Sequence, residues 1–352
     1  MKQTWKRMLG VLLVMALVIP SLTTAVSALS TGGAELSADA AVKLSNDIWD
    51  EIFEIEGRLE SEKAADKAIV DKLYEFVQNH AEVEMAKRES DYHFYFETVG
   101  GIPCTYDRRI EMKMESGEAP APIDTEALED LLGGKDTTPA TNLNIGVYSP
   151  YYGDDPSMTL NYLEAAQGVQ EVLGEDVCSV SSFYGAEGNI ESFKRFDEFG
   201  VVLVDSHGTA SGGKSWICVP FPGAYDSADF AEGNLLNGGS WIGVTGTFFE
   251  KYCDELDNTV VYLGICEGMK TDGLSTPILR HGGGFVMGYT ESVTFYYDGL
   301  MMPTIHELFV TESPADPSRY YTVEEACEKA KEIHGPVDTY GDAVLIWDGD
   351  GR

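Results

Sequence analysis

The spacing of apolar positions changes along the chain and separates two regions. Segments 48–59 and 68–83 place apolar residues at intervals of three and four, which is the pattern of amphipathic helices. A short β-like segment follows at 91–101. Residues 116–142 are rich in Pro, Gly, Thr and acidic side chains with little periodicity, which predicts a linker and a boundary near residue 140.

After the linker, continuous apolar runs alternate with amphipathic segments. The runs predict strands at 143–149, 176–182, 200–206, 259–265, 284–289 and 342–347. The segments between them predict helices at 157–174, 189–199, 274–280 and 322–334. Apolar strands that alternate with helices are typical of a parallel sheet covered on both faces. We therefore expect an α/β domain over residues 141–352, a three-layer sandwich with a mostly parallel sheet, preceded by a smaller, mainly helical N-terminal region.

The first 28 residues have the pattern of a secretory signal peptide. Lys2, Lys6 and Arg7 precede the apolar run "LGVLLVMALVI", and small residues follow at 26–28. The run is shorter than the roughly 20 residues that span a bilayer. We expect cleavage near Ala28 and a secreted protein, extracellular or at the cell surface, with no membrane attachment afterwards. An uncleaved membrane anchor is the alternative.

The net charge of the chain limits which kinds of partner it can bind. The chain has 24 basic and 59 acidic residues, a net charge of −35, and loss of the three basic residues of the signal would make it −38 (−35 − 3). Such a surface repels nucleic acid and anionic membranes, so we expect neither as a partner. It would attract cationic substrates, or it serves solubility alone.

Six cysteines invite a metal or disulfide interpretation. None of them has the CxxC or CxxH spacing of zinc sites, so we expect no metal and no other cofactor. Segments 151–156 and 347–352 carry acidic residues without EF-hand spacing and predict exposed turns. A disulfide framework is compatible with export, but the wide spacings do not require one. If Cys266 is a free thiol, the remaining five cannot all pair within one chain.

Two loops carry candidate chemistry. In an open α/β sheet, ligands bind beyond the carboxyl ends of the strands. The predicted strand at 200–206 leads into His207 and Gly208, and the one at 259–265 leads into Cys266. A crossover between them could place the strands side by side, so that the imidazole takes the thiol proton. The backbone N–H groups of Gly208 and Cys266 could then form an oxyanion hole. The structural alternative is a buried cysteine and an ordinary His-Gly turn.

These segments resemble the caspase–hemoglobinase fold of cysteine peptidases, in particular the gingipain branch, over about residues 142–348. "VDSHGTASGGKSW" is similar to that branch's histidine loop, including Trp216, and "YLGICEG" is similar to its nucleophile strand. "ILRHGGGFVMGYTESVTFYYDG" resembles the helix, strand and specificity loop that follow the nucleophile. "YGDAVLIW" resembles the closing Gly-Asp motif, with Ala343 where proline is commoner.

The resemblance implies His207 as general base, Cys266 as nucleophile, and the backbone amides of Gly208 and Cys266 as the oxyanion hole. Trp216 and Glu291 are candidate substrate-binding residues. Glu291 and Asp298 are candidate pocket acids, although a solvated surface charge is the plainer interpretation of each. Gly264 stands where several relatives that cut after Arg or Lys carry an acid.

Other signals have plainer interpretations. Asp205 could orient His207 or could face a neighbouring loop. The "HGGG" at 281–284 predicts a helix end, because no G-x-S-x-G nucleophile elbow accompanies it.

We therefore predict a secreted cysteine endopeptidase of caspase-like fold that cuts peptides or proteins through a thioacyl-enzyme, with no cofactor. Its predicted parts are a signal peptide (1–28), a helical pro- or accessory region (29–113), a linker (114–140) and a peptidase domain (141–352). A pro-segment is often removed on activation in relatives, but an adhesive or structural N-terminal domain is equally compatible with the sequence. Two alternatives to the peptidase stay open: a non-catalytic surface or interaction module, and an amidase or transpeptidase that acts on cell-wall amides.

Overall fold

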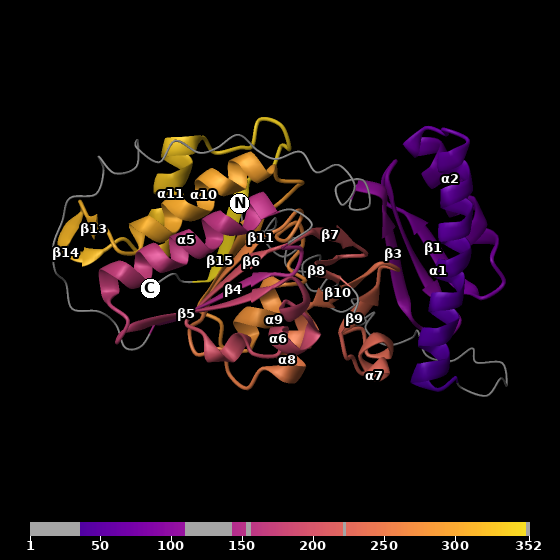
Figure 1. The fold of residues 1–352 in the computed structure, drawn as a ribbon, viewed down its shortest axis with the longest axis horizontal. Helices are drawn as coiled ribbons and strands as arrows, with labels where there is room; N and C mark the ends of the chain where they lie inside the picture. Colours follow the sequence, from indigo (N-terminus) through magenta and orange to yellow (C-terminus); the bar gives the residue numbers. More distant parts are fainter. Residues whose placement is uncertain (1–35, 110–142, 153–155, 221–222, 350–352) are drawn as a thin grey trace, which may run out of the picture. The chain divides into compact units, whose positions relative to one another are not determined.

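The computed structural model describes residues 36–109, 143–152, 156–220 and 223–349. The predicted signal peptide and linker lie outside the described residues. Residues from Ser37 onward belong to one compact unit. Figure 1 shows its helices and strands.

The N-terminal region has two helices and a three-stranded antiparallel sheet. The elements are α1 (Ala38–Ser61), α2 (Asp66–Asn79), β1 (Val83–Arg88), β2 (His93–Thr98) and β3 (Pro103–Asp107). Both predicted helices form, the predicted β-like segment at 91–101 contains β2, and the flanking strands β1 and β3 were not predicted. Helix α1 begins where the side chain of Ser37 accepts a hydrogen bond from Ala40 N–H, which satisfies one of the first free amide groups.

This region shares a sheet with later parts of the chain. β3 pairs with β9 through Cys104 and Asn237, which completes a seven-stranded sheet in the order β1-β2-β3-β9-β10-β8-β7. The later strands are β7 (Gly208–Ser211), β8 (Lys214–Pro220), β9 (Leu235–Asn237) and β10 (Trp241–Thr245), with α7 (Ser227–Ala231) before β9. Trp49 of α1 belongs to the same buried cluster as Ile217 and Ile242. The hydrophobic core therefore continues across the predicted boundary near residue 140.

A second sheet has six strands in the order β15-β12-β11-β6-β4-β5. Five are parallel, and β15 is antiparallel to β12. All six overlap the predicted apolar runs, although β5 and β15 begin two and three residues later than predicted: β4 (Leu143–Ser149), β5 (Cys178–Tyr184), β6 (Val201–Asp205), β11 (Val260–Gly264), β12 (Phe285–Tyr289) and β15 (Leu345–Gly349).

Helices cover both faces of this sheet (Figure 1). Val201 and Leu203 of β6 pack into one buried cluster, while Val202 and Val204 pack into another, because successive side chains of a strand point to opposite faces. The first face is covered by α5 (Pro156–Leu173), α10 (Phe295–Leu308) and α11 (Val323–His334). The second is covered by α6 (Ile190–Phe193), α8 (Gly246–Tyr252) and α9 (Ser275–Arg280).

The structure departs from the sequence prediction in three places. The protein is α/β with mixed sheets. A three-layer sandwich with one sheet was expected, whereas the structure has a second, seven-stranded sheet. The helix predicted at 189–199 ends at Phe193, and a short 3-10 turn, Phe196–Glu198, follows it. The sequence prediction also missed the helices α7, α8 and α10 and the small hairpin of β13 (Glu312–Ser313) and β14 (Asp316–Tyr320).

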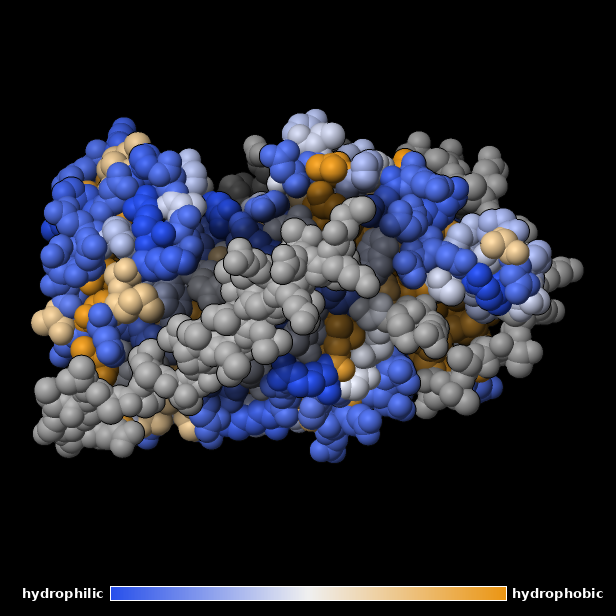
Figure 2. All heavy atoms as spheres, turned by 180° about the vertical axis from the view of Figure 1, so that it is seen from behind, coloured by the Kyte–Doolittle hydropathy of each residue, from blue (hydrophilic) through white to orange (hydrophobic). Residues whose placement is uncertain are grey.

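Hydrophilic residues cover most of the described surface on the face shown in Figure 2, in keeping with the acidic composition. Across the described ranges, the structure contains no helix that is both long enough and apolar enough to cross a membrane.

Candidate active site

The candidate histidine and cysteine follow neighbouring strands. β6 and β11 are parallel and adjacent, as predicted, and Asp205 pairs with Gly264. His207 and Cys266 each come two residues after that pair. The two residues therefore leave the same edge of the sheet at equal distances along their strands.

Gly208 brings the two loops into contact. A Cβ atom built on Gly208 would lie 2.8 Å from the Cys266 carbonyl oxygen and 2.8 Å from Cβ of Ile265. Real Cβ atoms do not approach other heavy atoms this closely, so only glycine fits without movement of the backbone. The loop after β6 thus packs directly on the backbone of the loop after β11.

Neighbouring strands fix the position of His207. Its ring packs edge-on against Tyr151, with the ring centroids 4.5 Å apart, and its carbonyl oxygen accepts a hydrogen bond from Cys218 N–H at 2.9 Å. The side chain is largely buried, with 8% exposed. Asp205 accepts a hydrogen bond from the Ser149 hydroxyl at 2.7 Å, so its carboxylate faces the end of β4.

Cys266 is partly exposed, whereas the other five cysteines are buried. Its Sγ lies 3.7 Å from the Val293 carbonyl oxygen. Desolvation raises the pKa values of four other thiols, which keeps them protonated. These are Cys104, Cys178, Cys253 and Cys327, the last two with pKa values of about 12. The exposure of Cys266 is what a reactive cysteine requires.

Glu267 anchors the turn after Cys266. Its backbone is left-handed, with φ of 58°, and its N–H donates to the Glu291 carbonyl oxygen at 3.1 Å. The carboxylate is buried and accepts hydrogen bonds from Ala210 N–H at 3.0 Å and the Thr209 hydroxyl at 3.2 Å. Lys270 Nζ donates to it at 3.0 Å. An acid follows the cysteine here because its carboxylate holds the two loops together.

Arg109, at the end of the N-terminal region, places a positive charge beside Glu267 and Ser292. The guanidinium donates two hydrogen bonds to Asp107, at 2.6 and 2.9 Å, and further ones to Glu267 at 3.4 Å and Ser292 at 3.3 Å. Burial opposes ionisation of Asp107, but the hydrogen bonds and charge of Arg109 outweigh it and lower the pKa of that carboxyl. The charge of Arg109 also interacts electrostatically with Cys266.

The candidate substrate-binding residues lie in different surroundings. Glu291 is exposed and pairs with Lys270 at 2.9 Å. Trp216 is fully buried in a cluster with Cys218, Leu236 and Trp241, so it offers no surface to a substrate in this conformation.

The interpretation of Asp298 as a solvated charge is wrong. Its carboxylate is buried and accepts hydrogen bonds from Tyr162 at 2.6 Å and Tyr262 at 2.7 Å, and burial raises its pKa. Tyr162 also explains the glycine two residues before the candidate nucleophile. A Cβ on Gly264 would overlap the Tyr162 hydroxyl, so an acidic side chain does not fit at that position.

Sequence reasoning missed Asp107, Arg109 and Thr209 as site residues, and it noted Glu267 without a role. Arg109 and Glu267 are 158 residues apart, and nothing in the local pattern of "YDRR" links them. The prediction that the "HGGG" segment ends a helix is confirmed, since α9 ends at Arg280.

Comparison with known proteins adds no assignment: no protein-family model matches the chain, and no curated protein matches its sequence. Within the described ranges, no group of three or more His, Cys, Asp and Glu side chains is placed to hold a metal ion.

Proposed function

We propose that the chain is a secreted cysteine endopeptidase in which Cys266 is the nucleophile and His207 the general base. The pairing of Asp205 with Gly264 carries the proposal, because it places an imidazole residue and a thiol residue equally far beyond two adjacent strand ends. A partly exposed thiol at that edge, among otherwise buried cysteines, supports the same assignment.

The reaction needs only these groups and water. The Cys266 sulfur attacks the peptide carbonyl carbon while His207 takes the thiol proton. The backbone N–H groups of Gly208 and Cys266 donate to the oxyanion, worth about 3 kcal/mol per donor. His207 then protonates the leaving amine as the C–N bond breaks. Water hydrolyses the thioester and releases the carboxylic acid and the free thiol.

Arg109 and Glu267 act as positioning residues in this proposal. Arg109 donates hydrogen bonds to Asp107 and Glu267 and so helps to fix the turn that follows Cys266. Glu267 fixes the turn that follows the nucleophile and thereby the direction of the Cys266 N–H. The N-terminal region therefore serves the working enzyme. The shared core favours an accessory region that stays bound over a pro-segment that is removed.

The caspase-like fold is part of the proposal. Five parallel strands with helices on both faces, and candidate residues after two adjacent central strands, are compatible with that architecture. The resemblance of the histidine and nucleophile segments to the gingipain branch supports it as well.

Labelling and cleavage assays test the function together. The secreted protein is incubated with peptide libraries and with an iodoacetamide probe, beside Cys266→Ala and His207→Ala variants. His80→Ala, on the N-terminal region, is the matched histidine control. We expect cleavage by the wild type and the control only, and loss of labelling in Cys266→Ala.

Other results would redirect the assignment. Labelling at Cys266 without turnover of any peptide would favour an amidase or transpeptidase that acts on another amide. Equal labelling of all variants without turnover would favour an interaction module.

A further inference from the structure

A cavity of about 790 Å³ opens at the edge of the six-stranded sheet opposite the candidate active site. It is lined where β4, β6 and β11 begin, whereas His207 and Cys266 lie beyond the carboxyl ends of β6 and β11. Its volume falls within the range of small-molecule sites, about 300–1,000 Å³. The cavity is thus large enough for a ligand and distinct from the proposed catalytic residues.

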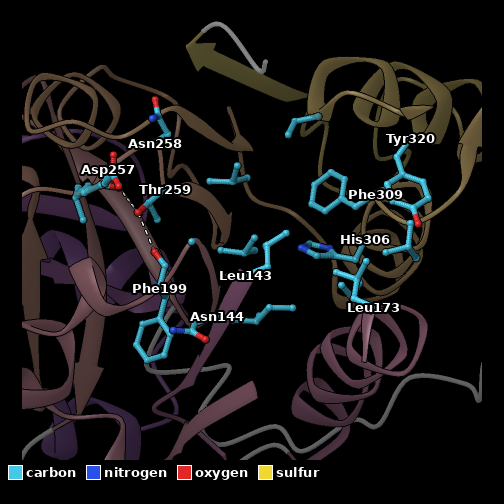
Figure 3. A pocket seen from close by; sticks show the side chains of 18 of the residues that line it. Leu143, Asn144, Leu173, Phe199, Asp257, Asn258, Thr259, His306, Phe309 and Tyr320 are labelled. Atoms are coloured by element: carbon cyan, nitrogen blue, oxygen red, sulfur yellow. Dashed lines mark hydrogen bonds between the residues drawn. The ribbon is translucent and has the colours of Figure 1, made fainter. Parts of the chain in front are cut away.

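The walls are mainly apolar and come from both sides of the opening. Figure 3 shows Leu143 at the start of β4 on one side, with Leu173, Phe309 and Tyr320 across from it. The described residues that line the cavity include three acids, Asp197, Glu198 and Asp257, and no lysine or arginine. An anionic ligand would find no compensating charge here, so the lining favours a neutral, largely apolar molecule.

His306 on α10 supplies one buried acceptor to this space. The side chain is fully buried, and its Nδ1 lies 2.8 Å from the Met302 carbonyl oxygen. A carbonyl oxygen only accepts, so Nδ1 carries the proton and Nε2 presents a lone pair. Nε2 is buried and has no hydrogen-bond partner among the residues that the structure describes. Figure 3 shows the imidazole directed into the cavity.

The imidazole stays neutral and fixed in place. Its ring packs edge-on against Phe309, with centroids 4.9 Å apart, and Tyr262 lies on another side at 6.0 Å. Burial lowers the pKa of His306 to about 4, so Nε2 accepts a hydrogen bond at neutral pH. A buried acceptor without a partner is unfavourable, and a ligand donor would relieve that cost.

We propose that this cavity binds a neutral apolar molecule with a single hydroxyl group, of the phenol or long-chain alcohol class, whose O–H donates to His306 Nε2. The apolar part of the ligand fills the space between two walls. One wall is formed by the first residues of β4, β6 and β11, and the other by α5 and α10. The site does not depend on the peptidase assignment, because binding is measured without turnover.

Three probes with the same ring system separate the contributions of the apolar ring, the hydroxyl group and a negative charge to binding. The probes are naphthalene, 2-naphthol and 2-naphthoate. Binding to the full-length secreted protein is followed at neutral pH by fluorescence and calorimetry. We expect 2-naphthol to bind about tenfold more tightly than naphthalene, because only it donates to Nε2. We expect 2-naphthoate not to bind measurably, since the lining offers no cation.

Two substitutions assign the contacts. His306→Phe keeps a ring but removes the acceptor, and it should reduce 2-naphthol affinity about tenfold while naphthalene affinity is unchanged. Leu173→Trp should narrow the cavity and weaken binding of both, and His80→Phe is the histidine control. In the wild type, 2-naphthol should shift the NMR resonance of His306 Nε2, a readout that does not depend on a variant folding.

Equal affinities for 2-naphthol and naphthalene, no shift at His306, or no binding of either would each overturn the proposal.

Discussion

Replacing Gly208 with alanine tests the contact between the loops that follow β6 and β11. The added methyl group would lie 2.8 Å from the Cys266 carbonyl oxygen and from the Cβ and Cδ1 atoms of Ile265. The Cδ1 atom can move by rotation, but the Ile265 Cβ and the Cys266 carbonyl oxygen move only with the backbone directly after β11. The loop after β6 must therefore move away from Cys266.

The cost follows from this crowding. Overpacking of a tight contact costs about 1–3 kcal/mol, which lowers the thermal midpoint by a few degrees in a unit of this size. A displacement of about 1 Å between reacting groups costs roughly 100-fold in rate. We expect a modest loss of stability and a much larger loss of peptidase activity.

Gly168→Ala and Gly57→Ala are matched controls. Both glycines are exposed on helices, and a Cβ there meets nothing within 4 Å. Alanine should stabilise each helix by about 0.5–1 kcal/mol without affecting activity. Thermal unfolding and peptide cleavage measure both effects. If Gly208→Ala kept wild-type stability and activity, the reasoning from this contact would be refuted.

Three further predictions concern charge and connectivity. Arg109→Met should destabilise the fold by roughly 3 kcal/mol in thermal unfolding, because it leaves the buried Asp107 carboxylate without its cationic partner, while the surface variant Arg195→Met should cost less than about 1 kcal/mol. His306, with its pKa lowered to about 4, binds its proton more readily when unfolded, so stability should fall by up to about 3 kcal/mol as pH drops from 6.5 to 4. Denaturant unfolding of the wild type and His306→Phe at the two pH values measures this, and an equal pH dependence in both proteins would contradict it. Cleavage at a protease site engineered between residues 116 and 142 should leave two fragments that co-elute in native size-exclusion chromatography, because α1 and β3 share the core; separate elution would show that the N-terminal region is dispensable for folding.

The sequence allowed prediction of the elements with strong apolar patterns. The runs that became β6 and β11 are buried on both faces, so their strand character is visible in composition alone. Their adjacency was inferred from the spacing of His207 and Cys266. Helix α10 was missed because "FYYDGLMMPTIHEL" is apolar on most sides and contains Pro303, so no periodicity marks it.

Long-range polar contacts could not be read from local patterns. The Thr209 hydroxyl lies within hydrogen-bond distance of both Asp107 and Glu267, which are far apart in sequence. Composition alone favours a solvated Asp298, yet tyrosines on two different elements enclose it. Such burial depends on which elements meet, and this is decided by packing of the whole chain.

The overlap between a Cβ atom on Gly264 and the Tyr162 hydroxyl limits which residues could replace this glycine. An acidic side chain at this position would first require loss of Tyr162. That loss would leave the Asp298 carboxylate with one tyrosine donor fewer in a fully buried place. An acid at position 264 therefore requires coordinated replacement of Gly264, Tyr162 and Asp298, whereas the partly exposed Glu291 already presents a carboxylate to solvent.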